Sequence, residues 1–358
     1  MATVIPRLKD NLTFDYAAIV DILGTLELDI KVFIDMNYEG SMLVDNIDSL
    51  QNINADLIII PLAAHPSELI GYTSWWAELK KLNKPFLVLT SVAIDNVNAL
   101  YCPIWPIIYP SQYITIPYPS EMNCTNSLRH YTYSCLNNRF TLDRAVNLIV
   151  WEKYHRVLCT DHLVTMIYSE ETIRTDPEAK EQLLLLDKLL DKTDSNYKEI
   201  FYGNLLTKFP IKNDKAIFNL DPFELMNNAF LDAYLNVITE HWHHTQTPFI
   251  SEKSLKPILA GQLFVHTGSV GSLEAMRNLG FDTYDDIIDH KLYEDKIDLF
   301  EKMEQIHQYL DKIKNQDWEK LYKDTEQRRL NNRNLLLSNT IKEKFVQQLK
   351  NRIYEILR

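Results

Sequence analysis

The sequence predicts an α/β protein made of two Rossmann-like domains that face a cleft, followed by a helical C-terminal tail. Short apolar runs alternate with segments of helical spacing, which indicates parallel strands joined by helices in a doubly wound sheet. The chain has 358 residues, of which 46% are hydrophobic, so it is long enough for two domains that each bury a core. After residue 295 almost every residue is a helix former. We therefore divide the chain into residues 1–125, 126–310 and 311–358.

The first domain is expected to begin with a helix over residues 15–30 and a short strand over residues 31–35. Asp56–Pro61 and Pro85–Ser91 are continuous apolar runs, which suit strands buried on both faces of a sheet. A helix is expected between these two strands, at Leu69–Leu82.

A proline-rich stretch separates the two domains. From Cys102 to Pro119 five prolines stand among four aromatic residues, which excludes a regular helix and fits an ordered loop or an edge strand. We place the crossing at residues 120–128. The second domain then opens with a strand over residues 130–136 and a helix over 141–153, and residues 176–200 are expected to form one polar amphipathic helix on the surface.

Ala233–Glu240 is predicted to be a strand, because residues 237–239 are all β-branched. Doubly wound folds bind ligands in the crevice outside the carboxyl ends of their strands, so the end of this strand should bring Glu240 to that crevice. The pattern that follows is a short helix, a strand, a glycine turn and a second helix. Gly261 and Gly280 are expected to terminate the two helices.

The short helix has an unusual charge pattern. If Ser251 or Ser254 caps its start, Lys253 and Lys256 lie in or beside the first turn, on one face. Cations are disfavoured there by roughly 0.3–1 kcal/mol each, because the helix dipole is positive at that end. A bound pyrophosphate would offset this cost, and Glu252 is better placed to accept hydrogen bonds from sugar hydroxyls. The alternative is a surface helix with a solvated charged face.

Two separated segments carry a resemblance to a known family. Glu240, Phe249-Ile-Ser-Glu-Lys-Ser-Leu-Lys-Pro257, Ala260-Gly-Gln262 and the glycine turn resemble the donor-site motif of a phage-encoded glycosyltransferase family. The C-terminal domain of that family in turn resembles that of the fucosyltransferases, which are of the GT-B type. Tyr133-Ser-Cys-Leu-Asn-Asn-Arg139, followed by Asp143-Arg144, is similar to the strand, loop and helix with which the same domain opens.

The resemblance covers residues 128–290 and implies a binding site for a nucleotide-sugar donor of the UDP- or GDP-sugar type, with no metal required. Two features depart from the family pattern: Ser251 stands where the family often has Thr, and the insert His241-Trp-His-His has no counterpart. By resemblance, Glu252 would contact the donor ribose, and Lys253 and Arg139 the pyrophosphate. The supporting donor-site residues would be Lys256, Asn138, Arg144, Glu240 and Gly268.

The resemblance also favours one acceptor. Phage members of the family suggest hydroxymethylated cytosine in double-stranded phage DNA, which would receive glucose, arabinose or a similar pentose inside the infected bacterial cell. Transfer to a glycan or a protein is the alternative within enzymes. A non-catalytic nucleotide-sugar-binding protein or a virion protein that kept the donor-domain fold is the alternative of another class.

A transferase of this kind also needs a base for the acceptor hydroxyl, and the ends of the strands in the first domain supply candidates. Asp35 ends one predicted strand, His65 and Glu68 lie in the loop after Pro61, and Asp95 follows a third strand. His65 and Glu68 follow the clearest buried strand, so they are the first to test. Each of these side chains could equally have a structural role.

The charge of the chain is polarised. The formal net charge of −12 opposes nonspecific attraction to nucleic acid or anionic membranes. However, residues 312–358 contain twelve basic and six acidic residues, against six basic and fourteen acidic residues in 1–125. The tail could cross back onto the first domain, or be a mixed-charge helix packed by Leu335, Leu336, Phe345 and Leu349. It could also present basic side chains to a polyanion: Lys320, Lys323, Arg328, Arg329 and Arg333.

The remaining features bear on metals and location. Four cysteines without CxxC or zinc-like spacing predict free thiols in a reducing cytosol. No apolar stretch resembles a signal peptide or reaches the roughly 20 residues of a membrane span, so a soluble, cytoplasmic protein is expected. Glu240, His241, His243 and His244 do not form an HExxH pattern. Surface histidines, or loop histidines lining an acceptor or sugar pocket, are therefore expected there rather than a metal site.

Overall fold

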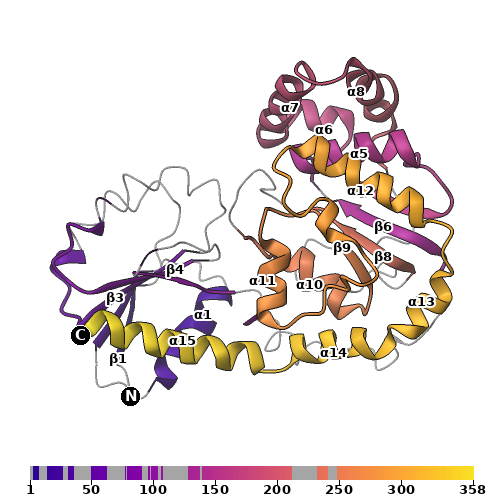
Figure 1. The fold of residues 1–358 in the computed structure, drawn as a ribbon. Coiled ribbons are helices and arrows are strands. Elements are labelled where there is room, and N and C mark those ends of the chain that lie inside the picture. The colour runs from indigo at the N-terminus through magenta and orange to yellow at the C-terminus, as the bar shows by residue number, and fades with distance from the viewer. Residues whose placement is uncertain are drawn as a thin grey trace. The chain divides into compact units, whose positions relative to one another are not determined.

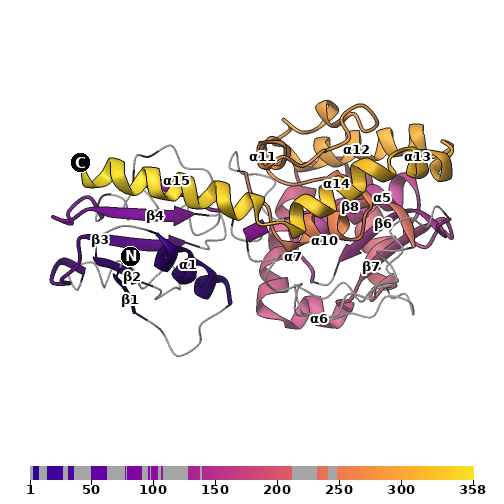
Figure 2. The same cartoon turned by 90° about the horizontal axis from the view of Figure 1, so that it is seen from below.

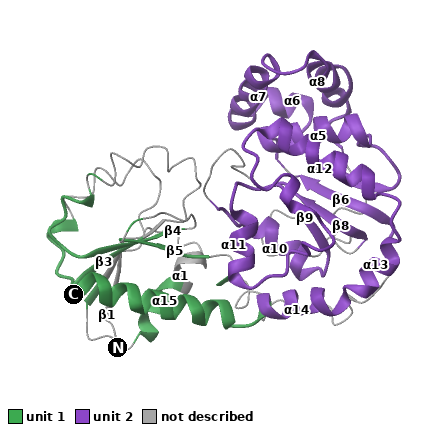
Figure 3. Cartoon of the chain, in the orientation of Figure 1, with its two compact units in different colours: residues 1–115, 337–358 green, residues 116–336 purple. Residues whose placement is uncertain are grey.

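The chain divides into two compact units in a computed structural model. One unit contains residues 1–115 and 337–358, and the other contains residues 116–336 (Figure 3). The expected boundaries lay at residues 125 and 310, and the last helix of the tail groups with the first unit. The structure describes residues 3–7, 14–26, 31–35, 50–62, 77, 79–90, 96, 98–103, 106–107, 128–137, 139–211, 232–240 and 248–358.

The first unit contains a parallel sheet of five strands, in the order β1-β2-β3-β4-β5 (Figure 1). The strands expected near residues 31, 56 and 85 are confirmed, whereas β1 and β5 were not expected. Their bounds are β1 Thr3–Arg7, β2 Lys31–Asp35, β3 Leu57–Leu62, β4 Phe86–Thr90 and β5 Ala99–Tyr101. The described strands follow one another in chain order, without the reversal of order that a doubly wound sheet contains.

The core of the first unit explains why its strands are continuous apolar runs. Leu57, Ile58, Ile59 and Ile60 of β3 are all buried, so both faces of this strand are covered. Helix α1 (Phe14–Thr25) corresponds to the helix expected at residues 15–30. Of the helix expected at 69–82, Ala77 and Leu79 are helical, while residues 69–76 and 78 lie outside the described part.

Helix α15 (Thr340–Leu357) belongs to the first unit and runs alongside β4 (Figure 2). Its buried side chains recur every four residues: Ile341, Phe345, Leu349 and Ile353. This spacing gives the helix one apolar face, which it packs on the unit. The basic side chains of α15 therefore lie on a helix that is held by its apolar stripe.

The second unit contains a parallel sheet of four strands, in the order β7-β6-β8-β9. Their bounds are β6 Tyr131–Asn137, β7 His162–Met166, β8 Ala233–Ile238 and β9 Leu263–His266. The chain adds β7 on one side of β6 and then returns to the other side for β8. This reversal creates a switch point at the carboxyl ends of β6 and β8, where open α/β sheets bind ligands. The expected strands at 130–136 and 233–240 are confirmed, whereas β7 was not expected.

The helices around this sheet are α5 (Leu142–Tyr154), α10 (Glu252–Leu259), α11 (Ser272–Leu279) and α12 (Leu299–Ile313). Gly261 and Gly280 follow α10 and α11 with φ angles of 62° and 101°. This left-handed conformation suits glycine and ends a helix, as the sequence predicted.

The single helix expected over residues 176–200 is wrong. The chain forms α6 (Glu170–Thr175), α7 (Pro177–Leu190) and α8 (Ser195–Glu199) instead. Asp176 caps α7 by accepting a hydrogen bond from the Ala179 N–H at 2.8 Å, and Pro177 occupies the first helical position. Asp194 caps α8 in the same way. These capping residues start new helices where the amphipathic pattern alone suggested continuity.

The tail helices α13 (Trp318–Asp324) and α14 (Glu326–Leu337) use much of their positive charge internally. Arg329 is only 1% exposed, and it donates to the Gly261 carbonyl at 2.7 Å and to the Tyr322 carbonyl at 2.6 Å. Arg328 donates to the carboxylates of Asp282 and Asp286. Lys320 forms an ion pair with Asp324. The suggestion that Arg329 faces a polyanion is therefore wrong, and Arg328 and Lys320 already have acidic partners.

No helix in the described ranges combines the length and the apolar character that crossing a membrane requires.

Candidate functional site

The candidate site lies at the carboxyl ends of β6, β8 and β9. Asn137 ends β6, Thr239 and Glu240 follow β8, and His266 ends β9. Helices α10 and α11 begin after β8 and β9 and pack beside them (Figure 1). Ser272 at the start of α11 joins the two helix starts, because its hydroxyl accepts from the Phe249 N–H and donates to the Phe249 carbonyl, both at 3.1 Å.

Glu240 anchors the start of α10. Its fully buried carboxylate accepts hydrogen bonds from the Ser251 N–H at 2.9 Å, from the Ser251 hydroxyl at 2.7 Å and from the Ser254 hydroxyl at 2.5 Å. Of the two serines considered as caps, Ser251 is the N-cap, and its hydroxyl oxygen accepts from the Lys253 N–H at 3.2 Å. Glu240 therefore fixes the position of this helix start through the donors of Ser251 and Ser254.

A histidine completes this chain of hydrogen bonds. The Gly268 N–H donates to Nδ1 of His266 at 3.1 Å, which leaves the ring proton on Nε2 to donate to the Ser254 hydroxyl at 2.9 Å. Burial, with the charges of His290 and Lys302, lowers the pKa of His266 to about 3, so the ring is neutral. A Cβ at Gly268 would lie 2.3 Å from Cε1 of His266. Gly268, predicted to bind the donor, therefore also has a packing reason to be glycine.

Glu252 and Lys253 lie in the first turn of α10, and Lys256 begins its last turn, where its charge still acts on Glu252. Nζ of Lys253 lies 2.7 Å from the Glu252 carboxylate and 3.3 Å from the Ser251 hydroxyl. Burial alone would raise the pKa of Glu252, but the charge and hydrogen bond of Lys253, together with Lys256, lower it to about 2. One cation and one carboxylate thus stand at the helix start, where the dipole disfavours positive charge, and a second cation lies one turn further along the helix.

Arg144 projects from the first turn of α5, and its guanidinium is buried at this site. Its side chain is 5% exposed, and Nη1 donates to the Arg139 carbonyl at 2.9 Å. Among the described residues, Nε has no hydrogen-bond partner. Burial lowers the pKa of Arg144, while the charges of Glu252 and Glu240 oppose that shift. Arginine stays charged in proteins, so a buried cation whose Nε–H has no acceptor among the described residues lies near Glu252 and Glu240.

Arg139, the other arginine predicted for the donor site, has an exposed side chain. The Arg139 side chain is 61% exposed, and its nearest acidic partner, Glu178, lies 3.9 Å away. Arg139 thus contributes its carbonyl to the site by holding Arg144, whereas its guanidinium lies in solvent. Of the other residues that the resemblance assigns to the donor site, Arg144, Lys253 and Lys256 all act electrostatically with Glu252.

Two more buried polar atoms at the end of β6 lack partners within the described part of the chain. They are Oδ1 of Asn137 and the hydroxyl of Thr141, the N-cap residue of α5. Buried polar atoms are almost always hydrogen-bonded in native proteins. Together with Nε of Arg144, these atoms mark the switch point as a place where a polar ligand would find donors and an acceptor.

No protein-family model matches this chain, and comparison with curated proteins and with solved structures also gave no match.

Several predicted residues fall outside the described part of the chain. They are Asn138, His65, Glu68, Asp95, the side chain of Asp35 and the histidines His241, His243 and His244. The backbone of Asp35 does end strand β2, as expected. Within the described ranges, no group of three or more His, Cys, Asp or Glu residues is arranged to hold a metal ion.

One charged residue was missed by the sequence reasoning. Lys302 of α12 is 1% exposed, and its ammonium donates to the Gly268 carbonyl at 2.8 Å. A signal for it exists in the sequence, because Lys302 falls on the apolar stripe formed by Leu299, Met303 and Ile306. A lysine in such a stripe is a buried cation that needs an explanation.

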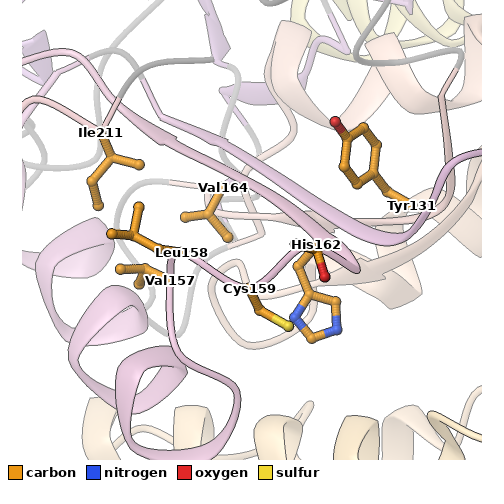
Figure 4. Close-up of a pocket in the computed structure, with 8 residues that line it drawn as sticks. Tyr131, Val157, Leu158, Cys159, His162, Val164 and Ile211 are labelled. Carbon is orange, nitrogen blue, oxygen red and sulfur yellow. The ribbon is translucent and has the colours of Figure 1, made fainter.

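A separate hollow of about 300 Å³ lies at the opposite edge of the same sheet (Figure 4). Tyr131 and His162 begin β6 and β7, so this hollow adjoins the amino ends of the strands. The rest of its wall includes Val157, Leu158 and Ile211, and none of the lining residues in the described part of the chain is Lys or Arg. These residues therefore offer no cation to a diphosphate.

Proposed function

We propose that this protein is a glycosyltransferase that moves a sugar from a nucleoside-diphosphate sugar to an acceptor hydroxyl. The observation that carries the proposal is the buried guanidinium of Arg144 at the switch point of the second sheet, with its Nε lacking a partner among the described residues. A buried charge that is not fully hydrogen-bonded is costly. A diphosphate would accept from Arg144 and lower that cost.

The start of α10 supports the same ligand. Lys253 is held by Glu252 and Ser251, and a diphosphate would compete for its ammonium. Phosphate oxygens also accept hydrogen bonds from the backbone N–H groups of a helix start. In a transfer reaction the departing nucleoside diphosphate gains negative charge, so Arg144, Lys253 and Lys256 would stabilise the transition state without a metal.

Glu252 suits a different part of the donor. Its pKa of about 2 keeps it ionised, so it repels phosphate oxygens and accepts hydrogen bonds from hydroxyl groups. This chemistry favours the ribose, which is the role that the family resemblance implies for Glu252.

We assign the acceptor to the first unit in a GT-B-type arrangement, with Asp35, His65 and Glu68 as candidate bases. Hydroxymethylated cytosine in DNA is proposed as the acceptor on the resemblance alone, because Arg328, Arg329 and Lys320 have partners within the protein. A glycan or protein acceptor is the alternative, and a nucleotide-sugar-binding protein without turnover is the alternative of another class.

The decisive experiment measures release of nucleoside diphosphate from a panel of UDP- and GDP-sugars, with and without hydroxymethylcytosine DNA. We expect release that is lost in Lys253→Ala and retained in Lys198→Ala, since Lys198 lies on α8 and pairs with Asp191 at 2.6 Å. DNA-dependent release identifies the acceptor. Binding of a nucleotide sugar without release in any combination would favour the non-catalytic alternative, and absence of binding would refute the proposal.

A further inference from the structure

Lys302 is a buried cation that has no acidic partner in contact among the described residues. Within the described part of the chain, its ammonium makes one hydrogen bond, to the Gly268 carbonyl at 2.8 Å, and no carboxylate lies within ion-pair distance. The charge of Asp295 acts on it from farther away. The described residues therefore accept from one of its three N–H groups, although the side chain is 1% exposed. Burying such a lysine costs free energy, so we expect its charge to have a functional role.

The position of Lys302 links it to the proposed diphosphate site. Gly268 opens the turn between β9 and α11, and its N–H is held by His266, which also bonds to Ser254 of α10. Gly271 precedes α11 with a φ of 84° and has no side chain to cap the helix. Lys302 therefore holds, through Gly268, the turn that leads into one helix start and is bonded to the other.

We propose that Lys302 is a positioning residue for the diphosphate: without touching the ligand, it fixes the turn over residues 268–271 and adds positive potential to the starts of α10 and α11. This inference rests on the proposed function of the same site. A neutral side chain could not act in this way, because it is the positive charge in a water-poor surrounding that attracts an anion over several ångströms.

The inference implies a pH dependence with a definite sign. Burial lowers the pKa of Lys302 to about 8, and Asp295 opposes this shift. The nearby imidazoles of His266 and His290 have lowered pKa values and are neutral in this range. On its own helix, Glu301 is paired with Lys296 at 3.0 Å. Lys302 is therefore charged below pH 8 and neutral above it, so affinity for a diphosphate should fall as the pH rises through 8.

The free energy of unfolding does not fall over the pH range in which the affinity should fall. Because Lys302 releases its proton more easily in the folded protein than in the unfolded chain, its contribution to the free energy of unfolding increases between pH 8 and 10.5. Loss of affinity in this range would therefore report the charge of Lys302 and not loss of structure.

The test is calorimetric titration with UDP and GDP between pH 7 and 9.5, where their phosphates stay ionised. The wild-type protein should lose about tenfold in affinity across this range, as expected for one partly screened charge. Lys302→Met should bind weakly at every pH, and Lys302→Arg should bind tightly at every pH because arginine stays charged. Lys291→Met, which changes an exposed lysine of the same unit, should keep the wild-type profile.

Hydrogen exchange of residues 266–273 in the ligand-free proteins provides a second measurement. Exchange there should be faster in Lys302→Met and unchanged in Lys302→Arg. If Lys302→Met does not fold, the dependence of affinity on pH in the wild type and in Lys302→Arg still tests the proposed role of Lys302. Equal profiles for these two proteins would overturn the inference and leave the proposed function intact, whereas absence of UDP and GDP binding in the wild type would overturn both.

Discussion

Ser254 lies within helix α10, yet its hydroxyl donates to the carboxylate of Glu240 at the end of β8, at 2.5 Å. A serine inside a helix often bonds back to its own backbone or faces solvent. Here it connects the helix to the strand and accepts a hydrogen bond from His266 of the next strand. The start of α10 is therefore held by side chains from two strands, which gives the site a rigid framework.

Ser254→Ala should destabilise the second unit by about 1–3 kcal/mol, because it leaves the Nε2–H of His266 unpaired and removes a donor from Glu240. The midpoint of thermal unfolding measures this loss. Ser195→Ala is the matched control, since Ser195 is exposed at the start of α8. Equal unfolding midpoints for the two variants would show that the hydrogen bonds of Ser254 contribute nothing to the stability of the protein.

Gly268→Ala should destabilise the protein by roughly 1–3 kcal/mol, as overpacking does in a tight core. The new Cβ would lie 2.3 Å from Cε1 and 2.9 Å from Nδ1 of His266, so the ring must move and its bond to Ser254 must break. Gly203→Ala is the control, because the nearest atom to its Cβ would be 3.9 Å away. In that helical segment alanine should be neutral or slightly stabilising. A similar result for both glycines in urea unfolding would contradict the close packing.

The strands that sequence reasoning identified share a local signal. The apolar runs of β3 and β4 and the β-branched end of β8 are visible in a window of a few residues. β1, β5 and β7 were missed because they are short and carry weaker signals: Pro6 interrupts β1, β5 has three residues, and β7 begins with His162. Strand order depends on contacts between distant segments, so the unreversed order of the first sheet could not be foreseen.

The site was predictable to the extent that it lies on one continuous segment. Ser251, Glu252 and Lys253 stand together in the sequence, and Ser251 caps α10 as one of the two expected candidates. The sequence could not predict that Arg144 is buried and Arg139 exposed, because this depends on which side chains face the core. Lys302 is more than thirty residues away, and only the fold brings it to Gly268.

Acid should destabilise the second unit through its buried histidines. Burial lowers the pKa of His155 to about 4, and the pKa values of His162 and His307 are also lowered. The unfolded chain takes up protons near pH 6.5 whereas the folded protein does not, so stability is complete above that pH. It should fall as the pH drops from 6.5 to 4, by about 3 kcal/mol for His155 alone.

Urea unfolding between pH 7 and 5 tests this dependence, since most carboxylates remain ionised there. His155→Phe keeps an aromatic ring against Trp151, which His155 contacts with ring centroids 5.8 Å apart, and it should make the pH dependence shallower by the contribution of His155 alone. His130→Phe changes an exposed histidine of the same unit and should keep the wild-type slope. An unchanged slope in His155→Phe would assign the acid sensitivity to other groups.

Arg144→Met should separate stability from ligand binding. The buried guanidinium makes one hydrogen bond, to the Arg139 carbonyl, and Nε has no partner in the described part of the chain. Replacing a poorly paired buried charge with an apolar side chain is often neutral or stabilising. The thermal midpoint should therefore stay the same or rise, while affinity for UDP or GDP should fall by roughly ten- to a hundredfold, the worth of a charged hydrogen bond.

The matched control is Arg174→Met on α6, where the arginine is exposed and bonds to Glu170 four residues earlier at 2.9 Å. This variant should keep its affinity and change stability by only a few tenths of a kcal/mol. If Arg144→Met instead unfolds the protein and Arg144→Lys restores both fold and affinity equally, the arginine is a structural partner of Glu240 and Glu252. If Arg144→Met folds normally and binds UDP and GDP as the wild type does, the diphosphate site lies elsewhere. A stable variant that no longer binds would show that the protein keeps an unfavourable buried charge because the ligand needs it.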